Sequence, residues 1–239
     1  MTKNIAELRN VSVRYKSRLS FFRHDYFNAL DNISFSIREG ETLGVIGANG
    51  CGKSTLLKVL ANIYGVDGGE VTWHCKQVSL LSLSLGFDAE LSGRDNAILS
   101  GMLLGGRKRE VLEKLDEIIE FSELENFIDK PIKTYSAGMR PRLGFSVALK
   151  MKSELLLIDE VLGVGDGKFK RKATTALADK INSNQTVVVV SHSLNQIKKL
   201  ADRVLWLDEG KVKMIDEPEN VLREYSDFIA LGKSLTKQS

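Results

Sequence analysis

Residues 47–54 read Gly47-Ala48-Asn49-Gly50-Cys51-Gly52-Lys53-Ser54. This run follows the apolar segment 43–46 and precedes a segment of helix-forming residues that begins at Thr55. A strand, a glycine-rich loop and then Lys-Ser at the start of a helix is the structural setting of a P-loop. The alternative is an ordinary glycine-rich turn, which does not require Lys-Ser at this spacing.

The residue types of this loop suit a chain of phosphates. Glycines let the backbone curve until its N–H groups face an anion, and the positive end of the following helix dipole points the same way. In such a loop Lys53 reaches the β- and γ-phosphates, and the Ser54 hydroxyl holds Mg2+. The sequence therefore predicts that residues Gly47 to Thr55 bind a nucleoside triphosphate.

The composition sets bounds on the protein class. The 239 residues, 43% of them hydrophobic, suffice for one domain or for a domain with a subdomain. A net charge of +3 does not by itself indicate nucleic acid or membrane binding. Cys51 and Cys75 lack metal-ligand spacing, which favours a reduced compartment. The polar start and the absence of a long apolar run predict a soluble protein.

Strand and helix patterns divide the chain. Residues 5–15 and 29–37 have strand character, and the apolar runs 155–158 and 187–190 suit parallel strands covered on both faces. Between about 90 and 150 the apolar residues recur at helical spacing. We therefore expect an α/β core, formed by residues 1–86 and 151–239, with a helical subdomain inserted at 87–150.

Two carboxylates follow the first of these apolar runs. Asp159 and Glu160 end a predicted strand, and ligands bind at the carboxyl ends of parallel strands. We expect Asp159 to hold Mg2+ through water and Glu160 to orient or deprotonate the attacking water. Either acid alone would be more simply explained as a surface cap, but the pair following a P-loop favours catalysis.

Two weaker signals complete the candidate site. A lone histidine after a strand is more often an ordinary polar residue, but the strand before His192 is a candidate neighbour of the Asp159 strand, which favours contact with the γ-phosphate. The segment Tyr135-Ser136-Ala137-Gly138-Met139 precedes an apolar helix. Its Ser-x-Gly pattern fits either a second anion site or simple helix capping.

The order of these motifs resembles the ATP-binding subunit of an ABC transporter over almost the whole chain. The resemblance implies a RecA-like P-loop core with an antiparallel β subdomain and an inserted α-helical subdomain. It also implies a head-to-tail homodimer with two bound ATP molecules, each touching Lys53 and Glu160 of one subunit and the signature segment, Tyr135 to Met139, of the other. Asp166 matches the D-loop. Tyr15 matches the aromatic residue that stacks on adenine, with Phe22 and Tyr26 as alternatives.

Departures from the family pattern narrow the resemblance to one branch. Ser82 or Leu83 stands where most members have glutamine, Met139 replaces the signature glutamine, and Val161 stands where proline is common. With segments 85–87 and 90–96, these changes resemble ATPases that export bacterial surface polysaccharides such as O-antigen, capsule and teichoic acid. This implies a Mg2+-dependent ATPase on the cytoplasmic face of the inner membrane, with a separate permease that handles the polysaccharide and no nucleic acid partner. The alternatives are a drug or lipid exporter and a soluble mechanical ATPase.

Three local features leave the sequence open to more than one interpretation. Residues 16–27 form either a short helix, as the resemblance implies, or an aromatic-anchored hairpin loop. Cys51 replaces the usual serine, and a thiol beside phosphates is open to oxidation or alkylation. Pro141 lies close behind Ser136, so the following helix either starts late or kinks.

Overall fold

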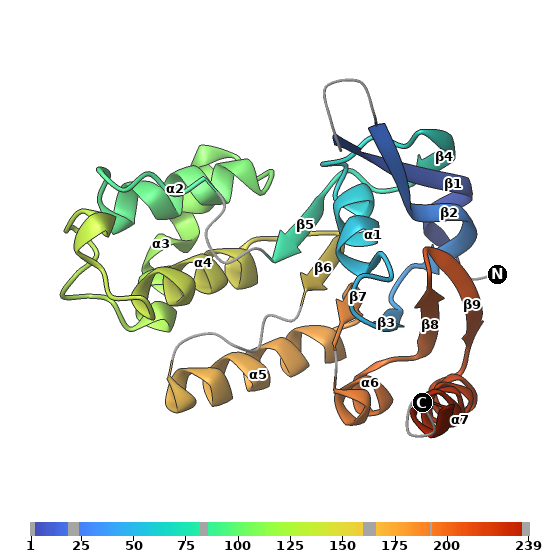
Figure 1. Ribbon diagram of the computed structural model, residues 1–239. Helices are drawn as coiled ribbons and strands as arrows, with labels where there is room; N and C mark the ends of the chain where they lie inside the picture. The colour runs from blue at the N-terminus through green and yellow to red at the C-terminus, as the bar shows by residue number, and fades with distance from the viewer. Residues whose placement is uncertain (1–2, 19–23, 82–85, 160–165, 192, 236–239) are drawn as a thin grey trace. The chain divides into compact units, whose positions relative to one another are not determined.

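The computed structural model describes residues 3–18, 24–81, 86–159, 166–191 and 193–235 (Figure 1). The chain forms two compact units. Unit 1 consists of Met1–His74 and Thr186–Ser239, and unit 2 consists of Cys75–Gln185. Unit 2 is larger than the predicted helical subdomain because it also contains two strands and a helix that flank it.

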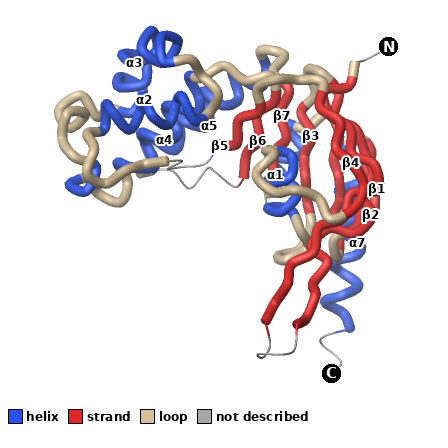
Figure 2. The backbone as a smooth tube through the Cα atoms, turned by 90° about the horizontal axis from the view of Figure 1, so that it is seen from above, coloured by secondary structure: helices blue, strands red, loops and turns tan. Residues whose placement is uncertain are grey.

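Unit 1 begins with an antiparallel sheet in the order β2-β1-β4. Its strands are β1 (Asn4–Arg18), β2 (His24–Arg38) and β4 (Gly68–Trp73). Figure 2 shows β1 and β2 running side by side as a long two-stranded arm, and the pairing continues as far as Arg18 opposite His24. The hairpin interpretation of 16–27 is therefore confirmed up to these residues, while 19–23 lie outside the described part of the chain.

The second sheet of unit 1 carries the P-loop. Its strands are β3 (Thr42–Ile46), β7 (Thr186–Val190), β8 (Arg203–Asp208) and β9 (Lys211–Asp216). β3 lies between β7 and β8 and is parallel to both, and β9 is antiparallel to β8. Every residue of β3 and β7 is buried, as their continuous apolar sequences predict.

Three helices lie in the part of unit 1 that the structure describes. They are α1 (Lys53–Leu60), α6 (Leu194–Leu200) and α7 (Pro218–Leu235). Gly44 of β3 lets α6 pack closely, because a Cβ there would lie 2.9 Å from Cγ2 of Ile197. On α7, the rings of Tyr225 and Phe228 meet Trp206 of β8 at centroid distances of 5.3 and 5.1 Å.

Unit 2 is mainly helical, as predicted for 90–150. Strand β5 (Val78–Leu81) pairs in parallel with β6 (Leu155–Asp159). The helices are α2 (Gly93–Leu103), α3 (Lys108–Ser122), α4 (Met139–Lys150) and α5 (Gly167–Asn182), with a 3-10 turn at Ile132–Thr134. Because α4 begins at Met139, Pro141 lies in its first turn, where a backbone N–H has no acceptor within the helix. The helix therefore loses no internal hydrogen bond at this proline.

An aromatic cluster joins three helices of unit 2. Phe121 of α3, Phe145 of α4 and Phe169 of α5 have ring centroids 5.8 to 6.2 Å apart. Phe145 and Phe169 are fully buried. Rings at these distances add a geometric preference to the burial of apolar area, so the cluster fixes how the three helices pack.

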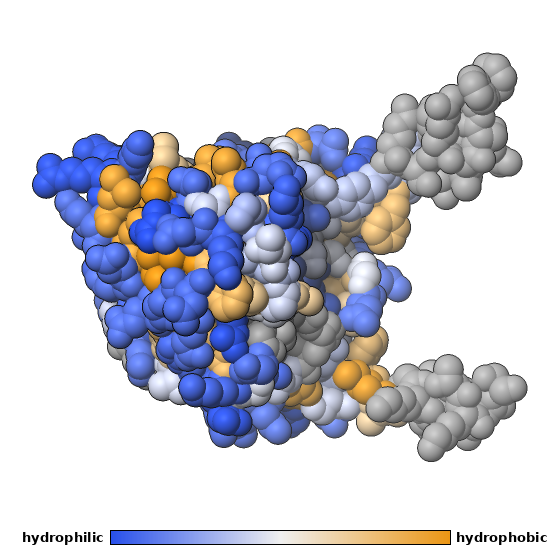
Figure 3. All heavy atoms as spheres, turned by 90° about the vertical axis from the view of Figure 1, so that its left-hand side faces the viewer, coloured by the Kyte–Doolittle hydropathy of each residue, from blue (hydrophilic) through white to orange (hydrophobic). Residues whose placement is uncertain are grey.

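Unit 2 also exposes large apolar side chains. Leu99, Met102 and Leu103 of α2 are 37, 44 and 55% exposed, and Leu112 of α3 is 47% exposed. Figure 3 views the molecule from the side on which these helices are drawn in Figure 1, and it shows apolar surface gathered among polar residues. We call these four residues the apolar face of unit 2.

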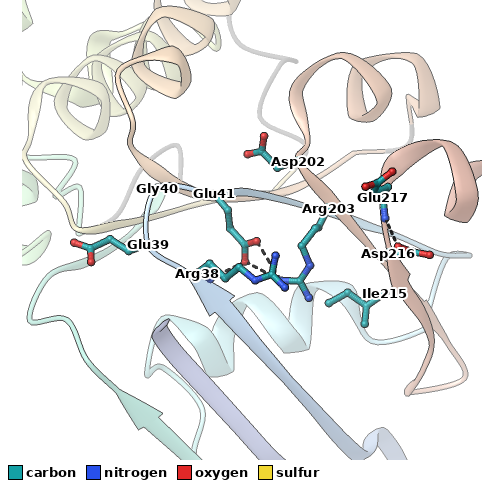
Figure 4. Close-up of a pocket in the computed structure, with 9 residues that line it drawn as sticks. All are labelled: Arg38, Glu39, Gly40, Glu41, Asp202, Arg203, Ile215, Asp216 and Glu217. Atoms are coloured by element: carbon teal, nitrogen blue, oxygen red, sulfur yellow. Dashed lines mark hydrogen bonds and ion pairs between the residues drawn. The ribbon is translucent and has the colours of Figure 1, made fainter. Parts of the chain in front are cut away.

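A hollow of about 530 Å³ lies in unit 1 where β3 and β8 begin (Figure 4). Its wall contains a buried ion pair, in which the Glu41 carboxylate accepts hydrogen bonds from Nη1 of Arg203 at 3.1 and 3.3 Å. Glu41 is only 7% exposed. The same carboxylate accepts the backbone N–H of Arg38, and the Thr42 N–H donates to Asp202. These bonds secure the start of the strand that ends in the P-loop.

We expect Arg203→Met to destabilise unit 1 by about 3–5 kcal/mol, because it leaves the buried Glu41 carboxylate without its cation. The control is Lys211→Met, which removes the exposed ion pair with Asp31 and should cost less than about 1 kcal/mol. Urea unfolding of the wild type and both variants measures the difference. Equal losses in the two variants would contradict the importance of the buried pair.

Candidate nucleotide-binding site

The P-loop connects β3 to α1 and depends on glycine for steric reasons. Gly47, Gly50 and Gly52 have φ angles of 151°, 79° and 107°. A Cβ at Gly47 would lie 2.1 Å from the carbonyl oxygen of Leu207, and one at Gly52 would lie 2.2 Å from that of Ala29. Gly50 has open space around it, so its φ angle alone favours glycine there. Backbone from β8 and β2 therefore holds two of the three turns in place.

Lys53 folds back into this loop. Its Nζ donates to the carbonyl oxygens of Gly47 at 2.8 Å and Ala48 at 2.9 Å, and the side chain is only 8% exposed. Helix α1, which is described in full, has neither a side-chain cap nor an acidic residue in its first turn. A buried ammonium beside an uncapped helix N-terminus fits the phosphates of a nucleotide. The loop's outer residues, Ala48 to Gly50, are exposed.

The Cys51 thiol is more protected than its sequence position suggests. The residue is 5% exposed, and its Sγ lies 4.0 Å from Nζ of Lys53. Burial raises the pKa of this thiol, so less thiolate is present at neutral pH. A Cβ at Gly47 would approach Sγ to 2.6 Å, so the thiol fills the space beneath the loop. The structure therefore argues against ready alkylation or oxidation at this position.

Tyr15 lies beside the P-loop helix. Its hydroxyl is 3.1 Å from Oγ1 of Thr55, and 38% of the residue is exposed. Of the alternatives proposed from the sequence, Phe22 lies outside the described residues, and Tyr26 is 62% exposed on the two-stranded arm. The position of Tyr15 next to α1 supports it as the residue that contacts the nucleobase.

The predicted magnesium and catalytic residues are distributed over both units. Ser54 is exposed as the second residue of α1, and the partly exposed Asp159 is the last residue of β6. Both occupy the element ends that the sequence predicted, and both offer the oxygen ligands that Mg2+ prefers. Glu160 and His192 lie outside the described residues.

The signature segment presents only part of itself to solvent. Tyr135 is buried, and its hydroxyl donates to the Phe127 carbonyl at 2.9 Å. Its side chain therefore packs within unit 2, and the contact of this residue with a nucleotide stays a prediction. Ser136 and Ala137 are exposed and Gly138 is half-buried, and within this described segment α4 has no side-chain cap. This finding weakens the helix-capping alternative for Ser136.

Asp166 caps α5 and contacts the helix that follows the signature segment. Its Oδ1 accepts the backbone N–H groups of Lys168 and Phe169, and its Oδ2 accepts Nη2 of Arg142 at 2.6 Å. The hydrogen bond from the Phe169 N–H lowers the pKa of Asp166, and the positive charge of Arg142 lowers it further. Sequence reasoning did not identify Arg142, although a cation one turn into a helix after an anion-binding pattern is a usable signal.

A glycine-dependent loop that encloses a lysine at an uncapped helix start defines a P-loop nucleotide-binding protein. Comparison with known proteins narrows this class. A family model described as "ABC transporter" matches residues 30–163, which is more than half of the chain. The chain belongs to the ABC transporter family.

Curated relatives agree with this assignment. The O-antigen export system ATP-binding protein RfbB of Klebsiella pneumoniae is 40% identical over 84% of this chain and 82% of that protein. The teichoic acids export ATP-binding protein TagH of Lactococcus lactis subsp. lactis is 43% identical over 89% of this chain and 45% of that protein. RfbB of Myxococcus xanthus is 41% identical over 86% of this chain and 47% of that protein. The chain thus spans about half the length of the last two.

Solved structures confirm the predicted fold. A dimeric structure of the ATP-binding cassette MJ0796, in a post-hydrolysis state bound to ADP and Pi, is similar with a TM-score of 0.74. It is 23% identical and covers 89% of this chain and 98% of that one. An ATP-binding subunit of an ABC transporter has a TM-score of 0.77 at 19% identity, covering 93% of each chain. Among the described residues, the helices are too short or too polar to cross a membrane.

We expect Cys75 to react with iodoacetamide before Cys51 in the folded protein. Burial raises the pKa of both thiols, but Cys75 is partly exposed whereas Cys51 is buried, so the reagent reaches Cys75 more easily. Mass spectrometry of peptides after timed labelling measures both rates. A Cys75→Ser variant should incorporate little label until urea unfolds it. Labelling of Cys51 as fast as that of Cys75 would contradict the protected position of the thiol.

Proposed function

We propose that this chain is the ATP-binding and ATP-hydrolysing subunit of an ABC exporter that moves a cell-surface polysaccharide. The observation that carries the nucleotide part is the P-loop, with Lys53 folded inside it and α1 uncapped. The cargo rests on the printed names of the relatives, which are export proteins for O-antigen or teichoic acids. The same names favour polysaccharide over the alternative drug, lipid or soluble mechanical functions.

The residues of the site have separable roles in this proposal. The loop backbone, Lys53 and Thr55 bind the triphosphate, and Tyr15 stacks on adenine. Ser54 and Asp159 would hold Mg2+, which offsets negative charge on the β- and γ-phosphates when bound. Glu160 orients or deprotonates the attacking water, and His192 contacts the γ-phosphate.

A second copy of the chain completes each site. The exposed part of the signature segment, from Ser136 to Gly138, has backbone N–H groups at an uncapped helix start. In the proposed head-to-tail homodimer, this segment contacts the ATP bound to the partner. The structural neighbour is described as a dimer, which supports the pairing of two copies. Asp166, held by Arg142, belongs to the same proposed interface.

The apolar face of unit 2 gives a place for the membrane partner. Leucine and methionine side chains are exposed on adjacent turns of α2, and contiguous apolar patches on a surface are suited to binding a partner. We propose that a cytoplasmic segment of an integral membrane permease binds there. The chain would then sit on the cytoplasmic face of the inner membrane, and the permease would handle most contacts with the polysaccharide.

Two substitutions separate binding from hydrolysis. Lys53→Ala should lose most ATP affinity, because it removes the charge inside the loop. Glu160→Gln should keep affinity but slow hydrolysis by about 10²–10⁴-fold and accumulate an ATP-bound dimer. Calorimetry, phosphate release and size exclusion measure these effects. Lys198→Ala, on the exposed surface of α6, is the control and should behave as wild type.

Unchanged ATP binding by the Lys53 variant would contradict the phosphate assignment. Wild-type hydrolysis by Glu160→Gln would contradict the role of that acid.

We expect a polytopic membrane protein to co-purify in stoichiometric amount with the tagged chain from detergent-solubilised membranes of its own source. Met102→Glu should reduce this recovery because it charges the apolar face, while ATP hydrolysis by the isolated chain stays unchanged. The matched control is Leu231→Glu on α7, a residue that is 68% exposed and lies in the other unit. A ribosomal or DNA-bound partner in place of a membrane protein would overturn the export function and leave the ATP chemistry intact.

A further inference from the structure

The loop that follows α1, residues 61–67, is tied to β1 beside Tyr15. The Asp67 N–H donates to the Ser12 carbonyl at 2.8 Å. In return, the Asp67 carboxylate accepts the Arg14 N–H at 2.6 Å. These two bonds fix the end of the loop against the strand residues that immediately precede Tyr15.

Tyr64 is held at the other end of this loop by α1. The backbone N–H groups of Ile63 and Tyr64 donate to the Lys58 carbonyl at 2.8 and 3.2 Å. Asn62 supplies the turn with a φ angle of 55°, which asparagine tolerates better than most residues. The Lys58 ammonium lies 5.2 Å from the centre of the Tyr64 ring, within the range of a cation–π contact. The ring of Tyr64 is therefore positioned from two sides before any ligand is present.

Tyr64 meets Tyr15 in an edge-to-face arrangement. The ring centroids are 6.0 Å apart and the planes are inclined by 72°. The Tyr15 hydroxyl is held separately by Thr55 at 3.1 Å. One contact therefore fixes the ring of Tyr15 and another fixes its tip, while both tyrosines remain more than a third exposed.

We infer that Tyr64 is a positioning residue for the aromatic ring on which the nucleobase stacks. The inference rests on the proposed function, since it assumes that Tyr15 receives the base. A ring already fixed in place loses little rotational freedom when a ligand stacks on it, so affinity improves without a new contact. Because Tyr64 acts through Tyr15, its effect falls on the nucleobase and leaves phosphate binding unchanged.

The test compares a ligand with a nucleobase and one without. Tyr64→Leu keeps apolar volume but removes the ring, and it should weaken MgATP binding about three- to tenfold, the range expected for an aromatic pair. Binding of magnesium tripolyphosphate should stay within about twofold of wild type. Tyr64→Phe keeps the ring and should bind both ligands normally. Ile63→Ala is the matched control, because it shortens the exposed neighbour in the same loop.

A double-mutant cycle shows whether the effect passes through Tyr15. In a Tyr15→Leu background, Tyr64→Leu should cause no further loss of ATP affinity. Tyr64→Met serves as a second variant if the leucine variant does not fold by circular dichroism. Wild-type ATP affinity in Tyr64→Leu and Tyr64→Met would overturn the inference. Equal losses of affinity for ATP and for tripolyphosphate in these two variants would overturn it as well. Failure of the proposed function would look different, because wild type and Lys53→Ala would then bind ATP equally.

Discussion

Two backbone carbonyls decide the shape of the P-loop. The oxygens of Leu207 and Ala29 come so close to Gly47 and Gly52 that any side chain there would collide with them. The loop must therefore approach neighbouring backbone from β8 and β2, and Lys53 finds its acceptors in the carbonyls that the resulting curve turns inward. The remaining features of unit 1 act on this arrangement by holding the strands that supply those carbonyls.

The buried pair of Glu41 and Arg203 holds β3 and β8 together at the ends opposite the P-loop. Glu41 lies just before β3 and Arg203 begins β8, so their hydrogen bonds fix where two parallel strands start relative to one another. The carboxyl ends of the same strands carry the P-loop and Leu207. A shift in register at one end would move the carbonyl that shapes the loop at the other. A buried ion pair is weak evidence for stability in itself, but its directional bonds suit the fixing of register.

The sequence predicted those parts of the protein in which local chemistry determines structure. Glycines followed by Lys-Ser specify a phosphate loop, and an all-apolar run specifies a buried parallel strand, so Gly47 to Ser54 and β3 were both predictable. Packing between distant segments was not. Nothing near Tyr135 indicates that its hydroxyl reaches Phe127, and the protection of Cys51 depends on its burial beneath the loop. Whether Pro141 kinks its helix depends on which residue begins α4, and sequence patterns locate a helix start only within a few positions.

The role of Tyr64 at the proposed nucleobase site could not be predicted from the sequence either. Phosphate binding uses backbone groups that all lie in one short glycine-rich segment, so it leaves a motif, although distant carbonyls of β8 and β2 hold that segment in place. Support for an aromatic ring needs only some side chain of suitable shape at the right place, and many loops can supply one. Tyr64 reaches Tyr15 because Asp67 and Lys58 hold both ends of a short loop, and the sequence separation between the two tyrosines gives no sign of this. The two ends of a nucleotide are thus bound by features of different kinds, of which one can be read from the sequence and the other requires the fold.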